Sequence, residues 1–347
     1  MAESRIVRDS YGGAGAEGPA SIEYRPYRGA EDDPLLLAIV LSNDAADGKT
    51  EPVSLEDIES FCKPTERFIP ARDLDIALVA GRNGEHMPAG FSRRSWYSGY
   101  RGCPLYCQYS CLAGEWRQAG IWPRMVRRNE ELLRSLHLER TGGASKEGAW
   151  LQAWASDCEK DWIAVLEDAG YELVRSFNNM RRSTAGVPDL VLPEGPVVKP
   201  VEPTQLRKIW EAQRELNLGV FECVEENWGD DSFEAWAREA EGRMVLWQVA
   251  WDGDEVAGTV LAHYEEGHVG KEGRSRGYTE HIYVRPSWRG RGLASALIAR
   301  ALRALAELGV EEAELGVDSR NESSAFALYR KMGYETESVD GWYRKPL

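Results

Sequence analysis

The segment VRPSWRGRGLASALIARAL, residues 284–302, holds the pattern that decides the fold. A strand is predicted to end at Val284, and a helix with apolar spacing is predicted over residues 293–308. Between them, glycines allow a ligand to approach the backbone, and the first N–H groups of the helix carry a partial positive charge. The turn therefore predicts a phosphate site on residues 289–294, with Arg289 and Arg291 adding charge.

Two other phosphate loops and a turn without ligand are the alternatives for this segment. A dinucleotide-binding loop needs Gly-x-Gly-x-x-Gly early in a strand–helix–strand unit, with an acidic residue about twenty positions later. Only Gly290-x-Gly292-x-Ala294 is present here, late in its domain. A Walker loop needs Gly-Lys followed by Ser or Thr, which the segment lacks. On glycine spacing alone, a tight turn that binds nothing stays open.

The elements around this turn follow a mixed strand and helix order. Apolar spacing predicts helices over residues 205–217 and 230–241, then a hairpin over 244–266 with its turn at 252–254. A strand at 281–284 precedes the turn, and a strand at 312–317 follows the helix at 293–308. In the segment NESSAFALYRKMGY, Asn321, Ala325 and Tyr329 are spaced four apart, so they share a helix face. Gly333 is placed to end that helix.

In this order, strand, turn, helix, strand and second helix resemble the GNAT superfamily of acetyl-CoA-dependent N-acetyltransferases. The resemblance covers residues 201–347 as a full domain and implies a mixed α/β sheet. A second, eroded copy is expected at residues 21–182, where a hairpin over 75–97 and a helix over 125–138 match the later elements. The tandem arrangement is similar to that of mycothiol synthase and related actinobacterial acetyltransferases, a likeness of architecture that implies no substrate.

The repeat is visible in the letters of the chain. The triplet GYE at 170–172 aligns with GYE at 333–335 at an offset of 163, and WR at 116–117 aligns with WR at 288–289 at an offset of 172. A repeat of this length, one to a domain, predicts two copies of one fold. We expect a lead-in without fixed structure at 1–20, a degenerate GNAT-like domain at 21–183, a Pro- and Gly-rich linker at 184–203 and a catalytic domain at 204–347.

The resemblance implies a role for each residue of the two motifs. The diphosphate of coenzyme A would bind the backbone amides of Arg289, Gly290, Arg291, Gly292, Leu293 and Ala294. Its pantetheine arm would bond to the backbone of Ile282 and Val284, flanked by Asn321 and Ala325. An amide near Val284 would polarise the thioester carbonyl, and Tyr329 would protonate the leaving thiolate. Acetyl-CoA would be a co-substrate, and no metal is expected.

The attacking amine must lose a proton, and the sequence offers several acceptors. Residues two apart in a strand share a face, so Glu280 is expected beside Ile282 and Val284 and is the first candidate for a general base. His281 would point to the other face, in a structural role. Further candidates are Glu225, Glu226 and Asp318. Ordered water can also carry the proton, so a single base need not exist.

The first copy lacks the residues that this chemistry needs. Trp122 stands at the position of Ala294, and Trp162 at that of Ala325, where an indole would obstruct the pantetheine arm. Leu166 replaces Tyr329 and has no proton to donate. The remaining replacements are Cys158 for Asn321 and Gln118-Ala119 for Gly290-Arg291. We therefore expect the first domain to be non-catalytic.

Composition narrows the classes of partner. The 347 residues carry a net charge of −15, which argues against nucleic-acid binding and slightly favours a cationic acceptor. The apolar run at residues 35–41 is too short to cross a bilayer, and the N-terminus does not read as a signal peptide. Six cysteines without an export signal indicate a cytoplasmic protein. Cys103, Cys107 and Cys111 lie in a predicted strand, too far apart to share a metal ion.

Together these patterns predict an N-acetyltransferase that acts through its second domain, by direct attack of a primary amine on acetyl-CoA. The acceptor is expected to be a small-molecule or peptide amine, and the protein a monomer or homodimer. Aminoglycosides, polyamines, amino-sugar thiols and protein amines all stay open as acceptors. The alternative is a non-catalytic acyl-CoA-binding protein with a regulatory or scaffold role, because the first copy has already lost the catalytic residues.

Overall fold

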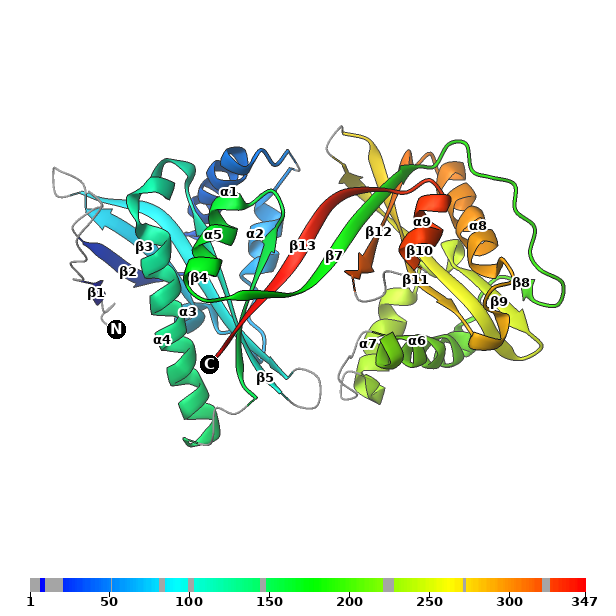
Figure 1. The fold of residues 1–347 in the computed structure, drawn as a ribbon, viewed down its shortest axis with the longest axis horizontal. Coiled ribbons are helices and arrows are strands. Elements are labelled where there is room, and N and C mark those ends of the chain that lie inside the picture. Colours follow the sequence, from blue (N-terminus) through cyan, green and yellow to red (C-terminus); the bar gives the residue numbers. More distant parts are fainter. Residues whose placement is uncertain are drawn as a thin grey trace. The chain divides into compact units, whose positions relative to one another are not determined.

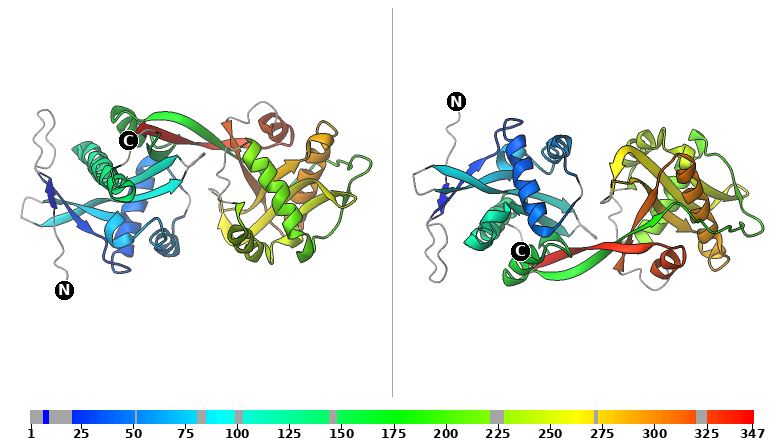
Figure 2. Two further views of the ribbon diagram at one scale, coloured as in Figure 1. Left: turned by 90° about the horizontal axis from the view of Figure 1, so that it is seen from below. Right: turned by 90° about the horizontal axis from the view of Figure 1, so that it is seen from above.

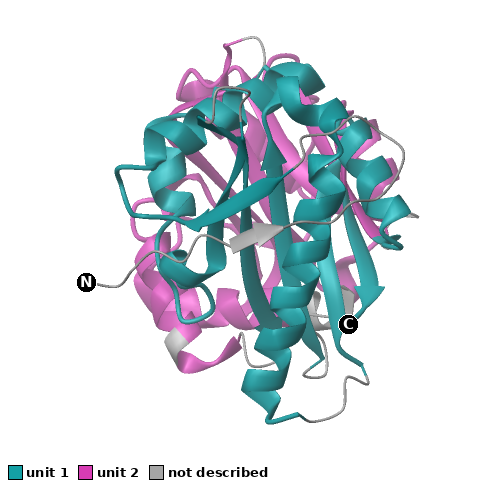
Figure 3. Ribbon diagram, turned by 90° about the vertical axis from the view of Figure 1, so that its left-hand side faces the viewer, with its two compact units in different colours: residues 1–174, 341–347 teal, residues 175–340 magenta. Residues whose placement is uncertain are grey.

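The computed structural model describes residues 7–9, 21–50, 52–80, 85–98, 103–143, 148–220, 228–270, 273–319 and 325–347. The chain divides into two compact units, shown in two colours in Figure 3. Unit 1 comprises residues 1–174 and 341–347, and unit 2 comprises residues 175–340. Each unit is a mixed sheet with helices on both faces, in agreement with the predicted α/β class.

Unit 1 is built on a sheet in which the strands follow the order of the sequence. Its antiparallel part runs through β1 (Val7–Asp9), β2 (Ile22–Pro26), β3 (Leu74–Ala80), β4 (His86–Ser98) and β5 (Pro104–Leu112). Next to β5 lies the parallel strand β6 (Trp150–Ser156), followed by residues 341–346 of β13 (Glu335–Pro346). The last segment is bonded in place by the Leu347 amide, which donates to the Ala149 carbonyl at 3.1 Å.

Helices cover both faces of the unit 1 sheet (Figure 1, Figure 2). One face packs against α1 (Asp33–Asp47) and α2 (Leu55–Phe61), in a core that includes Leu36, Ile39 and Ile58. The other face packs against α4 (Ile121–Thr141) and α5 (Lys160–Asp168). The short α3 (Pro70–Asp73) precedes β3, and a 3-10 turn over residues 114–119 precedes α4.

Unit 2 repeats this arrangement. The edge strand β8 (Val197–Val198) is followed by β9 (Gln248–Asp252), β10 (Glu255–Val269) and β11 (Ser275–Val284), all antiparallel neighbours. The parallel strand β12 (Glu312–Asp318) lies beside β11, and β7 (Glu172–Ser183) runs antiparallel to β12. Residues 335–340 of β13 complete the sheet beside β7.

The helices of unit 2 separate into two groups on opposite faces (Figure 2). On one face lie α6 (Leu206–Val220) and α7 (Asp230–Ala240), in a core with Val249, Leu261 and Tyr283. On the other lie α8 (Leu293–Glu307) and α9 (Ala327–Lys331). Gly277 lets α8 come close to the sheet, because a Cβ there would lie 2.7 Å from a Leu305 methyl. The helices predicted over residues 125–138, 205–217, 230–241 and 293–308 and both hairpins are confirmed. Of the helix predicted on NESSAFALYRKMGY, α9 is described, and residues 321–324 lie outside the described part.

Three boundaries differ from those expected. Residues 175–183 belong to unit 2 and residues 341–347 to unit 1, because the first segment lies beside β12 and the second beside β6. Val7–Asp9, expected in an unstructured lead-in, pair with β2, and the remaining residues of 1–20 lie outside the described part. The expected linker packs against unit 2 through Val187, Leu190 and Leu192.

Candidate functional site

The two central strands of unit 2 are paired over only part of their length. Parallel pairing of β11 with β12 joins Arg276 to Glu312, Gly277 to Ala313 and Tyr278 to Glu314. Beyond Tyr278, β11 continues to Val284 and β12 to Asp318 without further pairing between them. The edge of β11 that faces β12 therefore offers backbone groups from residue 279 onward to a ligand.

A β-bulge in β11 decides where these backbone groups point. Leu261 of β10 pairs with Glu280, whereas Thr259 pairs with Tyr283, so two residues of β11 oppose one of β10. His281, at this bulge, has φ 49°, the left-handed region that is uncommon for a residue other than glycine. Beyond the bulge the Arg285 amide donates to Ala257 of β10 at 2.9 Å. Amides alternate along a strand, so those of Ile282 and Val284 point to the opposite edge, toward β12.

The bulge also corrects the expected placement of Glu280. Ile282 and Val284 pack against the core that contains α8. Glu280 pairs with Leu261, whose side chain lies in the core on the α6 face. Residues directly opposite in a pair share a face, so Glu280 lies on the side opposite to Ile282 and Val284, and the expectation of one shared face is wrong. The physical reason is the extra residue in β11, which reverses the alternation of side chains.

The turn after β11 has the open backbone that the sequence predicts. Gly290 and Gly292 have φ 73° and 84°, and a Cβ on either would meet no atom within 4 Å. Gly292 is the N-cap of α8, and no side chain caps the helix, so its first N–H groups are available to an anion. The Leu293 side chain is buried, which leaves its backbone to bind. Ala294 is half-buried behind it.

The two arginines of the turn have partners within unit 2. Arg289 Nε donates to the Val284 carbonyl at 3.0 Å and so ties the turn to the end of β11. The Arg291 guanidinium lies over the Trp288 ring, 4.8 Å from its centroid. Both side chains are exposed, so their charges remain near the N-terminus of α8.

Tyr329 lies in α9, on the same side of the sheet as α8. Its side chain is buried, and burial raises the pKa of its hydroxyl to about 12, so the phenol is protonated at neutral pH. Its ring meets that of Tyr334 edge to face, with centroids 6.2 Å apart. Ala325 precedes α9 and packs against the same core. Asn321 lies outside the described residues, as do Glu225 and Glu226.

Two titratable side chains lie at the bulge. Burial raises the pKa of the half-buried Glu280, and the charges of Glu314 and Glu265 add to this against the opposing charge of Arg243. The His281 side chain has solvent access, but burial of part of the imidazole lowers its pKa, which favours the neutral form. Sequence reasoning assigned His281 a structural role. No local signal marks a bulge, because it depends on how β10 and β11 pair.

Asp318, another candidate base, is engaged in an ion pair. Its carboxylate accepts from Arg175 Nε at 2.7 Å, and its side chain is fully buried. Arg175 lies on β7, the strand beside β12. The position therefore indicates that Asp318 joins two strands of the unit 2 sheet.

Unit 1 has the same parting of strands, filled by two indoles. β5 and β6 pair from Leu105 with Trp150 to Cys107 with Gln152. The pair Leu105–Trp150 corresponds to Gly277–Ala313 of β11 and β12, at the sequence offsets of 172 and 163, so the register is the same. Trp122 Nε1 donates to the Ser110 carbonyl of β5 at 3.2 Å. Trp162 Nε1 donates to the Trp154 carbonyl of β6 at 2.8 Å, and the two rings are 5.5 Å apart. The indoles thus occupy backbone groups on both strands.

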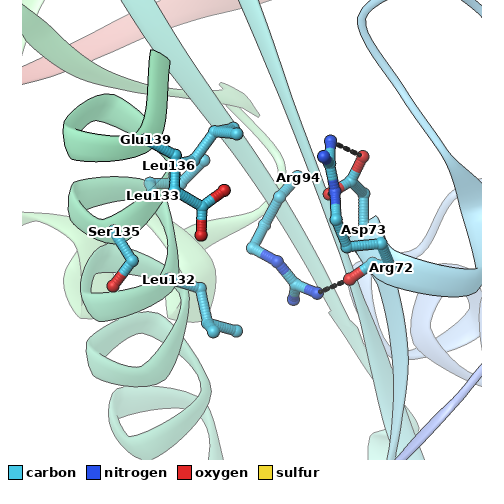
Figure 4. A pocket seen from close by; sticks show the side chains of 8 residues that line it. All are labelled: Arg72, Asp73, Arg94, Leu132, Leu133, Ser135, Leu136 and Glu139. Atoms are coloured by element: carbon cyan, nitrogen blue, oxygen red, sulfur yellow. Dashed lines mark hydrogen bonds and ion pairs between the residues drawn. The ribbon is translucent and has the colours of Figure 1, made fainter. Parts of the chain in front are cut away.

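A small cavity of unit 1 lies away from this parting (Figure 4). It measures about 110 Å³ and is lined by residues of α3, β4 and α4, among them Arg72, Arg94 and Glu139. Its two arginines are bonded to neighbouring groups. Arg94 donates to the Arg72 carbonyl and pairs with Asp75, and Arg72 pairs with Asp73. The cavity is therefore an internal junction of the unit.

Over the described part of the chain, no group of three or more His, Cys, Asp or Glu side chains is placed to hold a metal ion. Cys107 and Cys111 are buried in β5. None of the helices in the described ranges combines the length and apolar character needed to cross a membrane.

Sequence comparison gives one family and several relatives. Residues 206–334 match the acetyltransferase (GNAT) family. The protein named mycothiol acetyltransferase of Kocuria rhizophila is 29% identical over 211 residues, 56% of this chain and 65% of that protein. The protein of the same name from Streptomyces bingchenggensis is 28% identical over 212 residues, 57% of this chain and 64% of that protein. The match spans less than two thirds of either relative.

Solved structures share the fold of nearly the whole chain. A GCN5-related N-acetyltransferase from Sphaerobacter thermophilus superposes with a TM-score of 0.72 at 21% identity, covering 93% of this chain and 95% of that one. A tandem GNAT protein from the clavulanic acid biosynthesis pathway gives 0.57 at 16% identity, covering 93% and 98%. The two units thus have the architecture of a tandem GNAT fold.

Proposed function

Residues 206–334 match the acetyltransferase (GNAT) family, and on that premise we propose that unit 2 transfers an acetyl group from acetyl-CoA to a primary amine. The observation that carries the proposal is the open edge of β11 beside the uncapped, glycine-rich start of α8. The first offers backbone bonds to an extended arm, and the second offers a diphosphate site.

Binding of acetyl-CoA divides between these two features. The amides of residues 289–294 bind the diphosphate, and glycine at 290 and 292 allows the close approach that a side chain would prevent. The backbone of Ile282 and Val284 bonds to the pantetheine arm. The Val284 N–H polarises the thioester carbonyl, a role supported by its direction toward β12. Asn321 and Ala325 flank the arm.

The chemical step moves two protons. The amine nitrogen attacks the thioester carbon, and the carbon–sulfur bond breaks to release coenzyme A. Tyr329, protonated at neutral pH, donates to the leaving sulfur. Glu280 accepts the proton of the amine, helped by burial that raises its pKa. His281, neutral and accessible at the same bulge, is a second candidate for this acceptor.

Unit 1 is proposed to be non-catalytic. Trp122 and Trp162 occupy backbone carbonyls of β5 and β6, which leaves no gap for a pantetheine arm. Leu166, fully buried at the position of Tyr329, has no proton to donate. The acceptor amine belongs to a small molecule or a peptide, and acetyl-CoA is a co-substrate.

The test is a panel of primary amines incubated with acetyl-CoA, with release of free thiol as the readout. We expect turnover with at least one amine, and a loss of about 10²-fold or more in kcat for Tyr329→Phe with little change in coenzyme A affinity. Tyr106→Phe, which removes a buried hydroxyl in unit 1, is the matched control and should keep the parent kcat. Turnover by Tyr329→Phe at the parent rate would refute its role as the acid.

The diphosphate site has its own pair of variants. Gly292 and Gly120 are the N-caps of α8 and α4, both with positive φ and open space around the Cβ position. Tryptophan at either position has the same backbone cost of about 1–2 kcal/mol, so both variants should lose similar stability. Only Gly292→Trp should abolish coenzyme A binding, measured by calorimetry. Binding of coenzyme A by the parent without turnover of any amine would instead favour a non-catalytic acyl-CoA-binding protein.

A further inference from the structure

The bulge of β11 has a backbone carbonyl that accepts hydrogen bonds from two buried side chains. The His281 carbonyl accepts from Thr259 Oγ1 at 2.8 Å and from Gln213 Nε2 at 3.3 Å. Gln213 Nε2 also donates to Thr259 Oγ1 at 2.6 Å, so the three groups form a closed triangle. Thr259 is 0% exposed and Gln213 1% exposed. A strained residue is thus held by two side chains that are sealed from water.

The two donors come from different elements. Thr259 lies on β10, the neighbour of β11, and Gln213 lies on α6. On α6, Leu206, Ile209 and Ala212 pack in one core with Leu261 and Tyr283 of the sheet. The position of the His281 carbonyl is therefore fixed by the neighbouring strand β10 and by the covering helix α6. Neither element can shift without disturbing a packed core.

The bulge in turn sets the geometry of the proposed site. Because of the bulge, the backbone amides of Ile282 and Val284 point to the free edge of β11. The side chains of Ile282 and Val284 lie on the α8 face of the sheet, and the side chain of Glu280 lies on the α6 face. A regular strand would place these three side chains on one face. Loss of the bulge would thus move the acid–base groups relative to the thioester.

Unit 1 shows what the same strands do without these donors. There β4 and β5 pair without a register shift from Gly90 with Leu112 to Ser98 with Pro104. At the sequence offset of the repeat, Tyr109 stands at the position of His281, and its ring lies 6.0 Å from that of Phe91 on β4. We call Thr259 and Gln213, with their bonds to the His281 carbonyl, the brace of the bulge. Among the described residues, the bulge in this strand and its brace are present in unit 2, where the edge of β11 is open, and absent from β5 in unit 1.

From this geometry we propose that Thr259 and Gln213 are positioning residues, which hold the β11 bulge in the shape that acetyl transfer needs. They touch neither substrate and act through the His281 carbonyl. The inference rests on the proposed acetyl transfer for its effect on turnover, while the brace itself can be measured without any substrate.

The experiment compares Thr259→Val, Thr259→Ser and Gln213→Met with the parent. Valine keeps the shape of threonine but removes the hydroxyl, serine restores it, and methionine removes the second donor at similar length. We expect Thr259→Val and Gln213→Met to lower kcat about tenfold or more, since small misplacements of reacting groups have effects of this size. The dissociation constant for coenzyme A should stay near that of the parent, and Thr259→Ser should recover most of the kcat.

Thr184→Val is the matched control. Thr184 is also buried, and its hydroxyl donates to the Val310 carbonyl at 2.7 Å, away from the bulge. It should lower the melting temperature about as much as Thr259→Val while keeping the parent kcat. Equal kcat in Thr259→Val and Thr184→Val would overturn the positioning role, and Gln213→Met would decide the question if Thr259→Val failed to fold.

A second readout separates this inference from the proposed function. If the parent acetylates no amine, the function fails, but hydrogen exchange of the amides of residues 280–284 still reports on the brace. Thr259→Val should speed exchange in that segment relative to Thr184→Val. Equal exchange in the two variants would show that the hydroxyl does not hold the bulge.

Discussion

At the scale of single residues, Glu280 combines a cost in stability with a proposed role in catalysis. Burial and two neighbouring carboxylates raise its pKa, so the folded protein binds the Glu280 proton more tightly than the unfolded chain does. In the pH range between the unfolded and folded pKa values, stability falls as pH rises. The ionised form that can accept a proton is therefore the form that the fold disfavours.

Replacing Glu280 with glutamine removes this charge. We expect Glu280→Gln to be more stable than the parent near neutral pH, with the difference vanishing below the pKa of an unfolded glutamate. The same variant should lose kcat, and the acidic limb of the parent kcat/KM profile should lie above the ordinary glutamate range. Thermal unfolding and rate profiles over pH 4–9 measure both. A parent-like profile in Glu280→Gln would leave His281→Asn as the variant that identifies the base.

At the scale of elements, α4 and α5 supply the side chains that fill the space between β5 and β6 in unit 1. Their indoles Trp122 and Trp162 are buried, lie tilted to each other with ring centroids 5.5 Å apart, and are bonded to the strands on each side. In unit 2 the small Ala294 and Ala325 take the same places along α8 and before α9. One pair of aromatic side chains thus fills, in unit 1, the space that the proposed pantetheine arm takes in unit 2.

Trp162→Ala tests this difference. The loss of a buried indole should lower the free energy of unfolding by about 3–5 kcal/mol, as large-to-small core substitutions do, because the site leaves a cavity and Trp154 loses its bond. Denaturant titration followed by tryptophan fluorescence measures it. Acetyl-CoA turnover per folded molecule should stay at the parent value. A gain of turnover that survives Tyr329→Phe would show that unit 1 is catalytic after all.

At the scale of the whole molecule, each unit contains a strand segment from the other half of the chain. Residues 341–347 lie beside β6, where Lys345 Nζ bonds both carboxylate oxygens of Glu130 at 3.0 and 3.1 Å and Tyr343 enters the core of unit 1. Residues 177–183 pair along β12 in unit 2. Unit 1 therefore has all of its strands only when residues 341–347 are in place.

Deletion of residues 341–347 should unfold unit 1 first. The unit would lose Tyr343, the Lys345 ion pair and the hydrogen bonds along β6, leaving an unpaired strand edge. Hydrogen exchange should rise in β6 and α4, while β10 and α8 keep their protection. Lys345→Ala, which removes the ion pair alone, is the milder control. Equal protection of β6 in the parent and the deletion would contradict this placement.

The local sequence determined most of the elements and the two motifs. Apolar spacing located α6, α7, α8 and the β9–β10 hairpin within a few residues, and the Gly290–Gly292 turn was placed correctly at the start of α8. The replacement of small residues by Trp122 and Trp162 was also predicted, because aligning the two halves of the sequence is enough to compare side-chain volumes. These features depend on neighbours in the chain, so the sequence contains them.

Only the tertiary structure decided the bulge at His281, the face of Glu280 and the exchange of strands between the units. A bulge arises from the register between β10 and β11, held by Thr259 and by Gln213 from a distant helix. Strand alternation alone placed Glu280 beside Ile282 and was wrong by one residue. The choice of edge for residues 177–183 and 341–347 likewise depends on which strand is free to pair, which is a property of the assembled sheets.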